Sequence, residues 1–191
     1  MTEREFFERV KENPNNKTLL ERLPDVGLPD AWLVSGCLFQ TVWNTLTDRD
    51  PNHGIRDFDI FYFDDTDLSW EAEDASIKQA TAALANLDLP IEIRNQARVH
   101  LWYPQKYSMQ YPRLKAGHEG IDLFLATACM VGFQPNMGKQ PQLYAPKGLS
   151  DLAEMIIRPN EVANFNADNY RAKADRWKSA WPELAVLDPA S

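Results

Sequence analysis

Asp57-Phe58-Asp59-Ile60-Phe61-Tyr62-Phe63 is the stretch of sequence that most restricts the fold. Aromatic and β-branched residues dominate it, and these residue types are typical of strands. We therefore expect a strand over residues 57–63. Because side chains two positions apart project to the same face of a strand, Asp57 and Asp59 are expected on one face, with Cα atoms about 6.5–7 Å apart.

A second expected strand lies upstream of this stretch. The apolar run Ala31-Trp32-Leu33-Val34 is consistent with a buried strand, and Gly36 ends it. Apolar side chains then recur with helical spacing, so residues 37–46 are expected to form an amphipathic helix. Polar residues 47–56, which include a proline and a glycine, indicate a loop.

Downstream of the aspartates, Ser69 is a plausible N-cap of a helix over residues 70–86. Residues 91–95 (Ile-Glu-Ile-Arg-Asn) alternate as a strand, which we expect to continue through residues 98–103. The other expected elements are helices at 2–12, 16–23, 119–127, 148–152 and 166–180, and a hairpin of 128–133 with 141–145 around Gly138. This order predicts an α+β or α/β domain.

Length and composition favour one well-packed globular domain. The chain has 191 residues, of which 44% are hydrophobic and 25% charged. We expect residues 1–191 to form a single domain in which residues 1–27 and 160–191 are helical extensions. No apolar stretch is long enough to span a bilayer and the N-terminus is charged, which predicts a cytoplasmic protein that contacts no membrane.

Charge and cysteine content limit the partners. The net charge is −8, from 20 Lys and Arg against 28 Asp and Glu. No Lys or Arg run indicates a basic groove, so a long nucleic acid is disfavoured. A free nucleotide is still compatible, because metal ions can mask its phosphates. Cys37 and Cys129 have no metal-ligand spacing and are expected to be buried free thiols.

The chemistry is expected at the acidic pair. Two carboxylates on one strand face repel each other, and a shared divalent cation would remove that repulsion and attract phosphate oxygens. The alternative is that Asp57 and Asp59 are only the solvated start of an edge strand. Gly36 permits close approach of an anion to the backbone N–H groups of its turn, although it could also serve the turn alone. Glu92 adds a third acid, or else faces solvent from a half-exposed strand.

Three motifs together resemble the polymerase-beta nucleotidyltransferase superfamily, and within it a family of bacterial nucleotidyltransferase-like proteins. The motifs are residues 35–43 (Ser-Gly-Cys-Leu-Phe-Gln-Thr-Val-Trp), residues 57–64 (Asp-Phe-Asp-Ile-Phe-Tyr-Phe-Asp) and residues 94–100 (Arg-Asn-Gln-Ala-Arg-Val-His). The resemblance covers roughly residues 28–158. It implies a polymerase-beta-like α+β fold, with a small mixed sheet flanked by helices.

The resemblance also implies roles for five residues. Gly36 and Cys37 match the pair that holds the triphosphate, and Asp57 and Asp59 match the two metal-binding aspartates. Glu92 matches the third carboxylate, which is expected to join them in holding metal and which in active members helps the acceptor hydroxyl to lose its proton. The implied cofactor is Mg²⁺ or Mn²⁺. The sequence departs from the superfamily at Cys37, where a serine or glycine is usual, and in the longer stretch between Gly36 and Asp57.

The leading hypothesis is therefore a metal-dependent enzyme that transfers a nucleotidyl group from a nucleoside triphosphate to an unidentified acceptor hydroxyl and releases pyrophosphate. Metals at Asp57, Asp59 and Glu92 would stabilise the charge that develops during this transfer. The alternative is a nucleotide-sensing or protein-interaction module that retains the fold without catalysis. Arg94 and Arg98 could meet phosphate or could pair with nearby acids. The base, the acceptor and the oligomeric state are not determined by the sequence.

Overall fold

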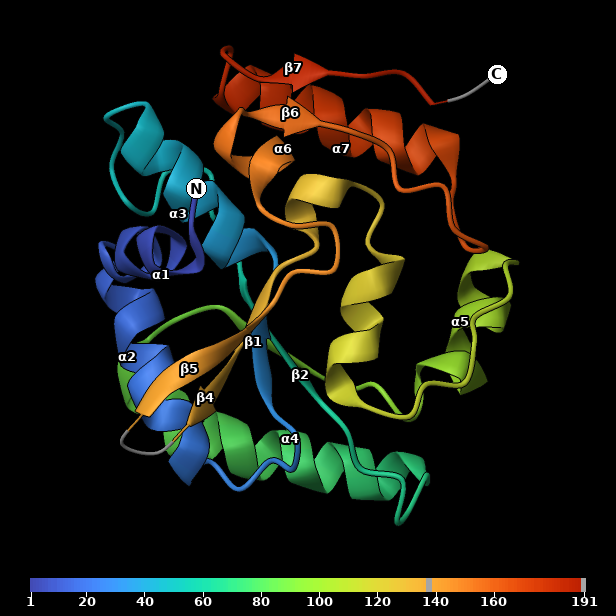
Figure 1. Cartoon of the computed structure of the whole chain (residues 1–191). Coiled ribbons are helices and arrows are strands. Elements are labelled where there is room, and N and C mark those ends of the chain that lie inside the picture. The colour runs from blue at the N-terminus through green and yellow to red at the C-terminus, as the bar shows by residue number, and fades with distance from the viewer. Residues whose placement is uncertain (137–138, 190–191) are drawn as a thin grey trace.

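The protein folds into a five-stranded sheet with helices on both sides (Figure 1), in a computed structural model that describes residues 1–136 and 139–189. The strands are β1 (Trp32–Val34), β2 (Phe58–Tyr62), β3 (Ile91–Asn95), β4 (Gly132–Asn136), β5 (Lys139–Tyr144), β6 (Ile156–Ile157) and β7 (Ala185–Val186). The α-helices are α1 (Glu3–Lys11), α2 (Pro14–Arg22), α3 (Gly36–Leu46), α4 (Trp70–Leu84), α5 (Val99–Tyr107), α6 (Ser150–Ala153) and α7 (Ala167–Ala180). The 3-10 helices are η1 (Leu23–Asp25), η2 (Ala85–Leu87), η3 (Gly117–Leu123) and η4 (Thr127–Cys129).

The main sheet is mixed and has the order β3-β2-β1-β4-β5. Strand β2 lies parallel to β3 and antiparallel to β1, and β4 is antiparallel to both β1 and β5. Strands β6 and β7 form a separate parallel pair. In Figure 1, α4 lies at the bottom of the view, below the main sheet, and α7 lies at the top beside β6 and β7.

The alternation of β2 gives the sheet two different faces. Phe58, Ile60 and Tyr62 are buried in the main hydrophobic core, together with side chains of α3 and α4. Asp59 and Phe61 project from the opposite face, where a smaller apolar cluster surrounds Trp32 and Val34. Strand alternation therefore places the large apolar side chains on one face and leaves the acidic ones on the other.

Both ends of the chain contribute to the main core. Phe6 and Val10 of α1 are fully buried, and Phe6 stacks on Phe133 with ring centroids 5.3 Å apart. At the other end, Trp177 and Trp181 pack edge-on against Trp43 of α3. Each such aromatic side chain buries a large apolar area, so both terminal segments stabilise the sheet.

The expected elements around the main sheet are present, with small shifts at their ends. The loop expected between the two N-terminal helices is shorter than predicted, because Pro14 occupies the first turn of α2, where its missing N–H leaves no helical bond unmade. The expected helix over 119–127 is instead the 3-10 helix η3 followed by extended backbone at Phe124. The predicted hairpin is formed by β4 and β5, but its first strand begins at Gly132 and not at residue 128, because Thr127–Cys129 form the 3-10 helix η4. The turn at Gly138 lies outside the described residues.

The predicted continuation of the strand through residues 98–103 is wrong, because the chain turns after Asn95 into α5. The side-chain Oδ1 of Asn95 accepts hydrogen bonds from the N–H groups of Ala97 and Asp64, both at 3.1 Å, and its Nδ2 donates to the Asp64 carbonyl at 2.8 Å. An Asn that bonds the backbone two residues ahead closes a turn. This turn ends β3 and starts the helix.

We expect Asn95→Ala to lower the free energy of unfolding by about 2–4 kcal/mol, because it leaves two buried N–H donors and one carbonyl without partners. Urea unfolding measures the change. The matched control is Asn86→Ala in η2, where the side chain is exposed and a change within about 0.5 kcal/mol is expected. Equal stability of the two variants would show that the Asn95 turn does not hold β3 and α5 together.

Candidate active site

Asp57 lies immediately before β2, and Asp59 is the second residue of that strand. Both line a pocket of about 250 Å³, together with Ser35 and Gly36. Asp59 is the pairing partner of Val34 across β1 and β2, and Val34 stands two residues before Gly36. The antiparallel pairing of β1 and β2 is therefore what brings the acidic pair to the turn that begins α3.

The turn at the start of α3 presents backbone to this pocket. Ser35 precedes the helix with φ 55° and ψ −112°, a conformation that non-glycine residues rarely adopt and that costs of order 1–3 kcal/mol. Its side chain does not cap the helix, and the first N–H groups of a helix have no acceptor within it. A Cβ added at Gly36 would meet only the flexible end of Gln40, at 3.4 Å. Nothing rigid in the fold excludes a larger residue here, so the small size of Gly36 suits close approach of an anion.

Cys37 does not offer its side chain to the pocket. The thiol is fully buried in the main core and lies 3.8 Å from the Val34 carbonyl. Burial, followed by the negative charge of Asp59, raises the pKa of the Cys37 thiol well above its ordinary value. Only the main chain of Cys37 is therefore suited to contact a ligand. The other cysteine, Cys129, is also a buried free thiol, as the sequence predicts.

Three basic residues complete the pocket: Arg56 from the loop before β2, and Lys173 and Arg176 from α7. Within the part of the chain that the structure describes, none of the three forms an ion pair. Burial, and then the nearby charge of Arg56, lower the pKa of Arg176. Positive charge that is unpaired and partly desolvated stabilises a bound polyanion.

The local field makes the ionised form of Asp59 costly. Burial, followed by the charges of Asp57 and Glu92, raises the pKa of Asp59 to about 7. Lys173 and Arg94 act in the opposite direction but do not offset these effects. A divalent cation would remove the repulsion among these carboxylates.

Glu92 lies beside the acidic pair but outside its pocket. It is the pairing partner of Asp59 across the parallel strands β2 and β3, so the two side chains project from the same face of the sheet. Its carboxylate is about half exposed and forms an ion pair with Arg94 at 3.4 Å. It also lines a groove at the edge of the sheet, together with residues of α4 and α5. Ile93 is buried on the opposite face.

The donor set fits a cation that also binds phosphate. Among the described residues, no group of three His, Cys, Asp or Glu side chains lies close enough to hold a metal without other ligands. Mg²⁺ is commonly held by one or two carboxylates together with substrate phosphate oxygens, and it keeps several waters. Asp57 and Asp59 would supply those carboxylates, and the pocket leaves room for the phosphates.

The two arginines near the acids have different roles. Arg98 is buried, where its guanidinium pairs with Glu73 and its Nε donates to the Leu68 carbonyl at 2.9 Å. It therefore joins the start of α5 to α4 and does not line the acidic pocket. Arg94 is half exposed beside Glu92, and its side chain lines a larger cavity next to the acidic pocket.

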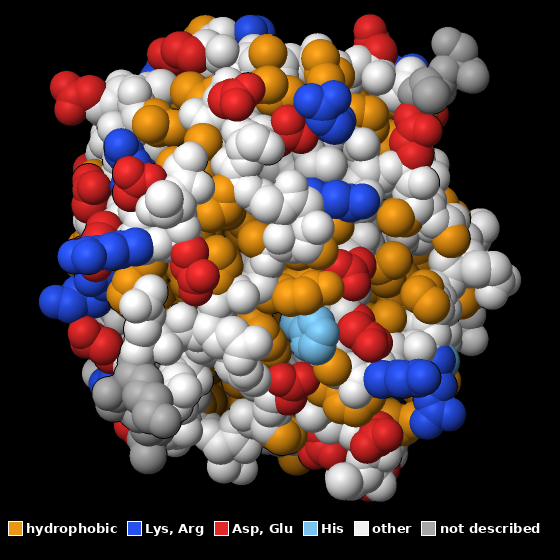
Figure 2. Space-filling model, in the orientation of Figure 1, with side chains coloured by type: hydrophobic (Ala, Val, Ile, Leu, Met, Phe, Trp, Pro, Cys, Tyr) orange, Lys and Arg blue, Asp and Glu red, His pale blue; other side chains and the backbone are white. Residues whose placement is uncertain are grey.

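Helix α7 contributes side chains that the sequence does not predict for this site. Residues 166–180 were expected only as a polar helix, yet Asn169, Lys173 and Arg176 all line cavities beside the acids. Their spacing of four and three residues places them on one face of the helix. That spacing is visible in the sequence, but it does not show what the face contacts. Figure 2 shows acidic and basic side chains interspersed on the face that it presents, without a continuous basic groove there.

The mixed five-stranded sheet, with its glycine turn leading into α3, has the arrangement expected of the polymerase-beta-like nucleotidyltransferase class. A solved structure described as "The NMR structure of the protein reveals a CCA-adding enzyme head domain" is similar in fold, with a TM-score of 0.77 and 23% sequence identity over 98% of this chain and 97% of that chain. The expected fold is thus confirmed.

The sequence profile of the family described as Nucleotidyltransferase matches residues 21–186. The chain belongs to this nucleotidyltransferase family, and nucleotidyl transfer is the activity that the family supports. No match was found among curated proteins. None of the helices in the described ranges is long and apolar enough to cross a membrane.

We expect Asp59→Asn to stabilise the metal-free protein above pH 7. Between about pH 4 and 7 the folded protein keeps a proton on Asp59 that the unfolded chain has lost, so rising pH lowers the stability of the wild type. Asparagine cannot ionise, so the variant gains about 1–4 kcal/mol at pH 8 and little at pH 4. Urea unfolding with chelator, at both pH values, measures the gain.

The matched control for this prediction is Asp65→Asn, which changes an exposed aspartate outside the pocket. It should leave the pH dependence of the wild type in place. A wild type and an Asp59→Asn variant with parallel stability curves from pH 4 to 8 would contradict the electrostatic description of the pocket.

Proposed function

We propose that this nucleotidyltransferase transfers a nucleotidyl group from a nucleoside triphosphate to an acceptor hydroxyl, with a divalent metal at Asp57 and Asp59 and with Glu92 as the base. The observation that carries the proposal is the meeting of opposite charges in one small pocket. Two carboxylates, three unpaired cations and the first turn of α3 all border the same space. A metal–triphosphate complex has the charge distribution that complements this pocket.

The first part of the proposal concerns how the triphosphate is held. The backbone N–H groups at Gly36 and Cys37 donate to phosphate oxygens, and the helix dipole of α3 favours their negative charge. Lys173 and Arg176 approach from α7 on the other side of the pocket. When bound, Mg²⁺ or Mn²⁺ would neutralise charge on the phosphates and on the two aspartates.

The second part concerns the transfer step. The acceptor oxygen attacks the α-phosphorus in line with the leaving group, and a new phosphorus–oxygen bond forms. The bond between the α-phosphorus and the oxygen bridging to the β-phosphate breaks, and pyrophosphate leaves with that oxygen. Glu92 takes the proton of the acceptor hydroxyl. Its place next to Asp59, outside the pocket and about half exposed, supports this role because an acceptor can reach it from solvent.

We expect nucleoside triphosphate to bind only with divalent metal, and Asp57→Asn to weaken that binding more than tenfold, or about 1.4 kcal/mol. The variant removes one of the two charges that hold the metal and leaves the fold intact. Calorimetry with each of the four nucleoside triphosphates, in Mg²⁺ and in chelator, measures the affinity. Equal affinity in chelator would refute the metal-dependent site.

We expect Glu92→Gln to leave triphosphate affinity within a few-fold and to reduce transfer by roughly 10²–10⁴, the scale of a lost general base. The paired measurement is triphosphate binding and pyrophosphate release with candidate acceptors. Glu71→Gln changes an exposed glutamate of α4 and serves as the control. Full transfer by Glu92→Gln would remove Glu92 from the mechanism. Binding without pyrophosphate release by the wild type with every acceptor would favour the non-catalytic module instead.

We expect Lys173→Gln and Arg176→Gln each to weaken metal–triphosphate binding by about tenfold, because each removes a charge that faces the phosphates. The control is Arg171→Gln on the same helix, where the side chain is half exposed and 3.6 Å from Asp168, away from the pocket. High salt should also weaken triphosphate binding by the wild type, because it screens the attraction between these charges and the phosphates. If the control weakened binding as much as the two pocket variants, a general effect of net charge would explain the result.

A further inference from the structure

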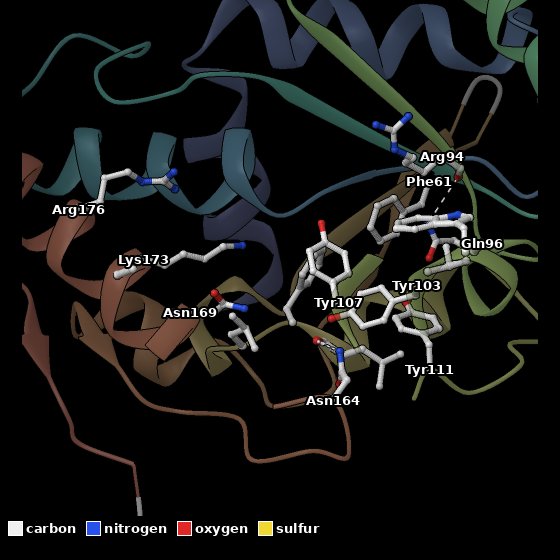
Figure 3. A pocket seen from close by; sticks show the side chains of 17 residues that line it. Phe61, Arg94, Gln96, Tyr103, Tyr107, Tyr111, Asn164, Asn169, Lys173 and Arg176 are labelled. Atoms are coloured by element: carbon white, nitrogen blue, oxygen red, sulfur yellow. Dashed lines mark hydrogen bonds between the residues drawn. The ribbon is translucent and has the colours of Figure 1, made fainter. Parts of the chain in front are cut away.

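A second, larger cavity adjoins the acidic pocket. Its volume is about 530 Å³, and Figure 3 shows the side chains that line it. This size is in the range of small-molecule sites. One wall is aromatic and comes mainly from α5 and the segment after it: Trp102, Tyr103, Tyr107 and Tyr111. The rings of Tyr103 and Tyr107 lie 4.6 Å apart, and those of Tyr103 and Tyr111 lie 4.7 Å apart.

Two amide side chains at the wall of this cavity each carry a buried oxygen without a hydrogen-bond partner. Gln96 and Asn164 are 2% and 4% exposed, and both line the cavity. The amide nitrogen of Gln96 faces the Arg94 carbonyl at 3.5 Å, and that of Asn164 faces the Leu123 carbonyl at 3.4 Å. These contacts orient the amides and leave Oε1 of Gln96 and Oδ1 of Asn164 unpaired among the described residues. A buried acceptor without a donor costs about 1–3 kcal/mol, so a ligand with donor groups would satisfy both.

Gly120 fixes the position of the Gln96 amide. A Cβ at this residue would lie only 2.3 Å from Oε1 of Gln96. The glycine therefore leaves room for the amide at the cavity wall. Gln96 itself is tied to the end of β2, because its N–H donates to the Tyr62 carbonyl at 2.8 Å.

The cavity lies between the proposed triphosphate site and Glu92. It shares Phe124, Leu125, Lys173 and Arg176 with the acidic pocket. It shares Arg94, Trp102 and Tyr107 with the groove that Glu92 lines. A molecule in this cavity can therefore reach both the α-phosphate and the proposed base, which is the position that an acceptor needs.

We propose that this cavity binds the acceptor, and that the acceptor is a small hydroxylated ring compound, a sugar or a cyclitol. The inference rests on the proposed function, because it assigns the acceptor of that same site. The C–H face of such a ring is apolar and packs on the rings of Trp102 and Tyr107. The hydroxyl groups on its rim donate to the unpaired oxygens of Gln96 and Asn164. A remaining hydroxyl then faces Glu92 and the α-phosphate.

A nucleobase fits the same walls less well. A base would also stack on the aromatic side chains, but it carries only one or two donor groups on its rim, and its other ring nitrogens and carbonyls are acceptors, like the unpaired groups at this wall. A hydroxylated ring carries a donor at nearly every rim position. The net charge of −8 also disfavours a long nucleic acid as the acceptor.

The test is binding of defined probes to the full chain, with the nucleoside triphosphate measured separately. Glucose, galactose, mannose, glucosamine, myo-inositol and adenosine are each titrated by saturation-transfer NMR, in the presence of Mg²⁺ and a non-hydrolysable triphosphate. The variants are Gln96→Met, which keeps the side-chain length and removes the acceptor, and Trp102→Leu. The control is Gln105→Met, an exposed position of α5 that does not line the cavity. Circular dichroism checks that each variant is folded.

We expect at least one sugar or the cyclitol to bind the wild type and to lose affinity at least tenfold in Gln96→Met and in Trp102→Leu. The control should bind that probe as the wild type does, and triphosphate affinity should stay within twofold in all three variants. Binding of no sugar or cyclitol would overturn the inference. So would binding of adenosine alone, or loss of triphosphate affinity in the cavity variants, since either result makes this a nucleoside site. If the wild type binds a sugar but no triphosphate, the proposed function fails while the cavity assignment stands.

Discussion

The alternation of β2 is the constraint on which the rest of the site depends. Phe58, Ile60 and Tyr62 stabilise the fold only if all three face the main core, so the intervening acidic positions must face the other side. A register shift by one residue would expose three large side chains and bury the carboxylates. Burying a charge without a partner is costly. Burial of these three apolar side chains in the core thus stabilises the position of Asp59, although the neighbouring acids repel it there.

Pairing in the sheet then determines what the acids meet. The antiparallel partner β1 brings the turn at Gly36 to Asp59, and the parallel partner β3 brings Glu92. Backbone hydrogen bonds fix both neighbours, so the acids and the helix N-terminus are positioned by rigid elements instead of loops. Sites that bind highly charged ligands benefit from this, because the charged groups do not have to reorganise when the ligand arrives.

The basic residues of α7 on the other side of the acidic pocket are positioned in a different way. Lys173 and Arg176 reach the pocket because Trp177 and Trp181, on and just after the same helix, pack against Trp43 in the core. Aromatic burial therefore positions the cations as well as stabilising the C-terminal segment. The aromatic cavity beside the acidic pocket depends on the Asn95 turn, because this turn directs the chain from β3 into α5, whose side chains line the cavity. One fold thus places a polar, charged pocket directly beside a larger aromatic one.

The sequence alone determined the local part of this arrangement. The strand at β2, the shared face of its aspartates, the glycine turn before α3 and the alternation of β3 all follow from spacings within a few residues, where side-chain direction is set by the backbone. The roles of Gly36, Cys37, Asp57, Asp59 and Glu92 in catalysis stay predictions. Only the tertiary structure showed that α7 faces the acids, that Arg98 pairs with Glu73, and that residues after Asn95 turn into a helix. Periodicity fixes which residues share a face of a helix, but where that face docks depends on packing between segments more than a hundred residues apart.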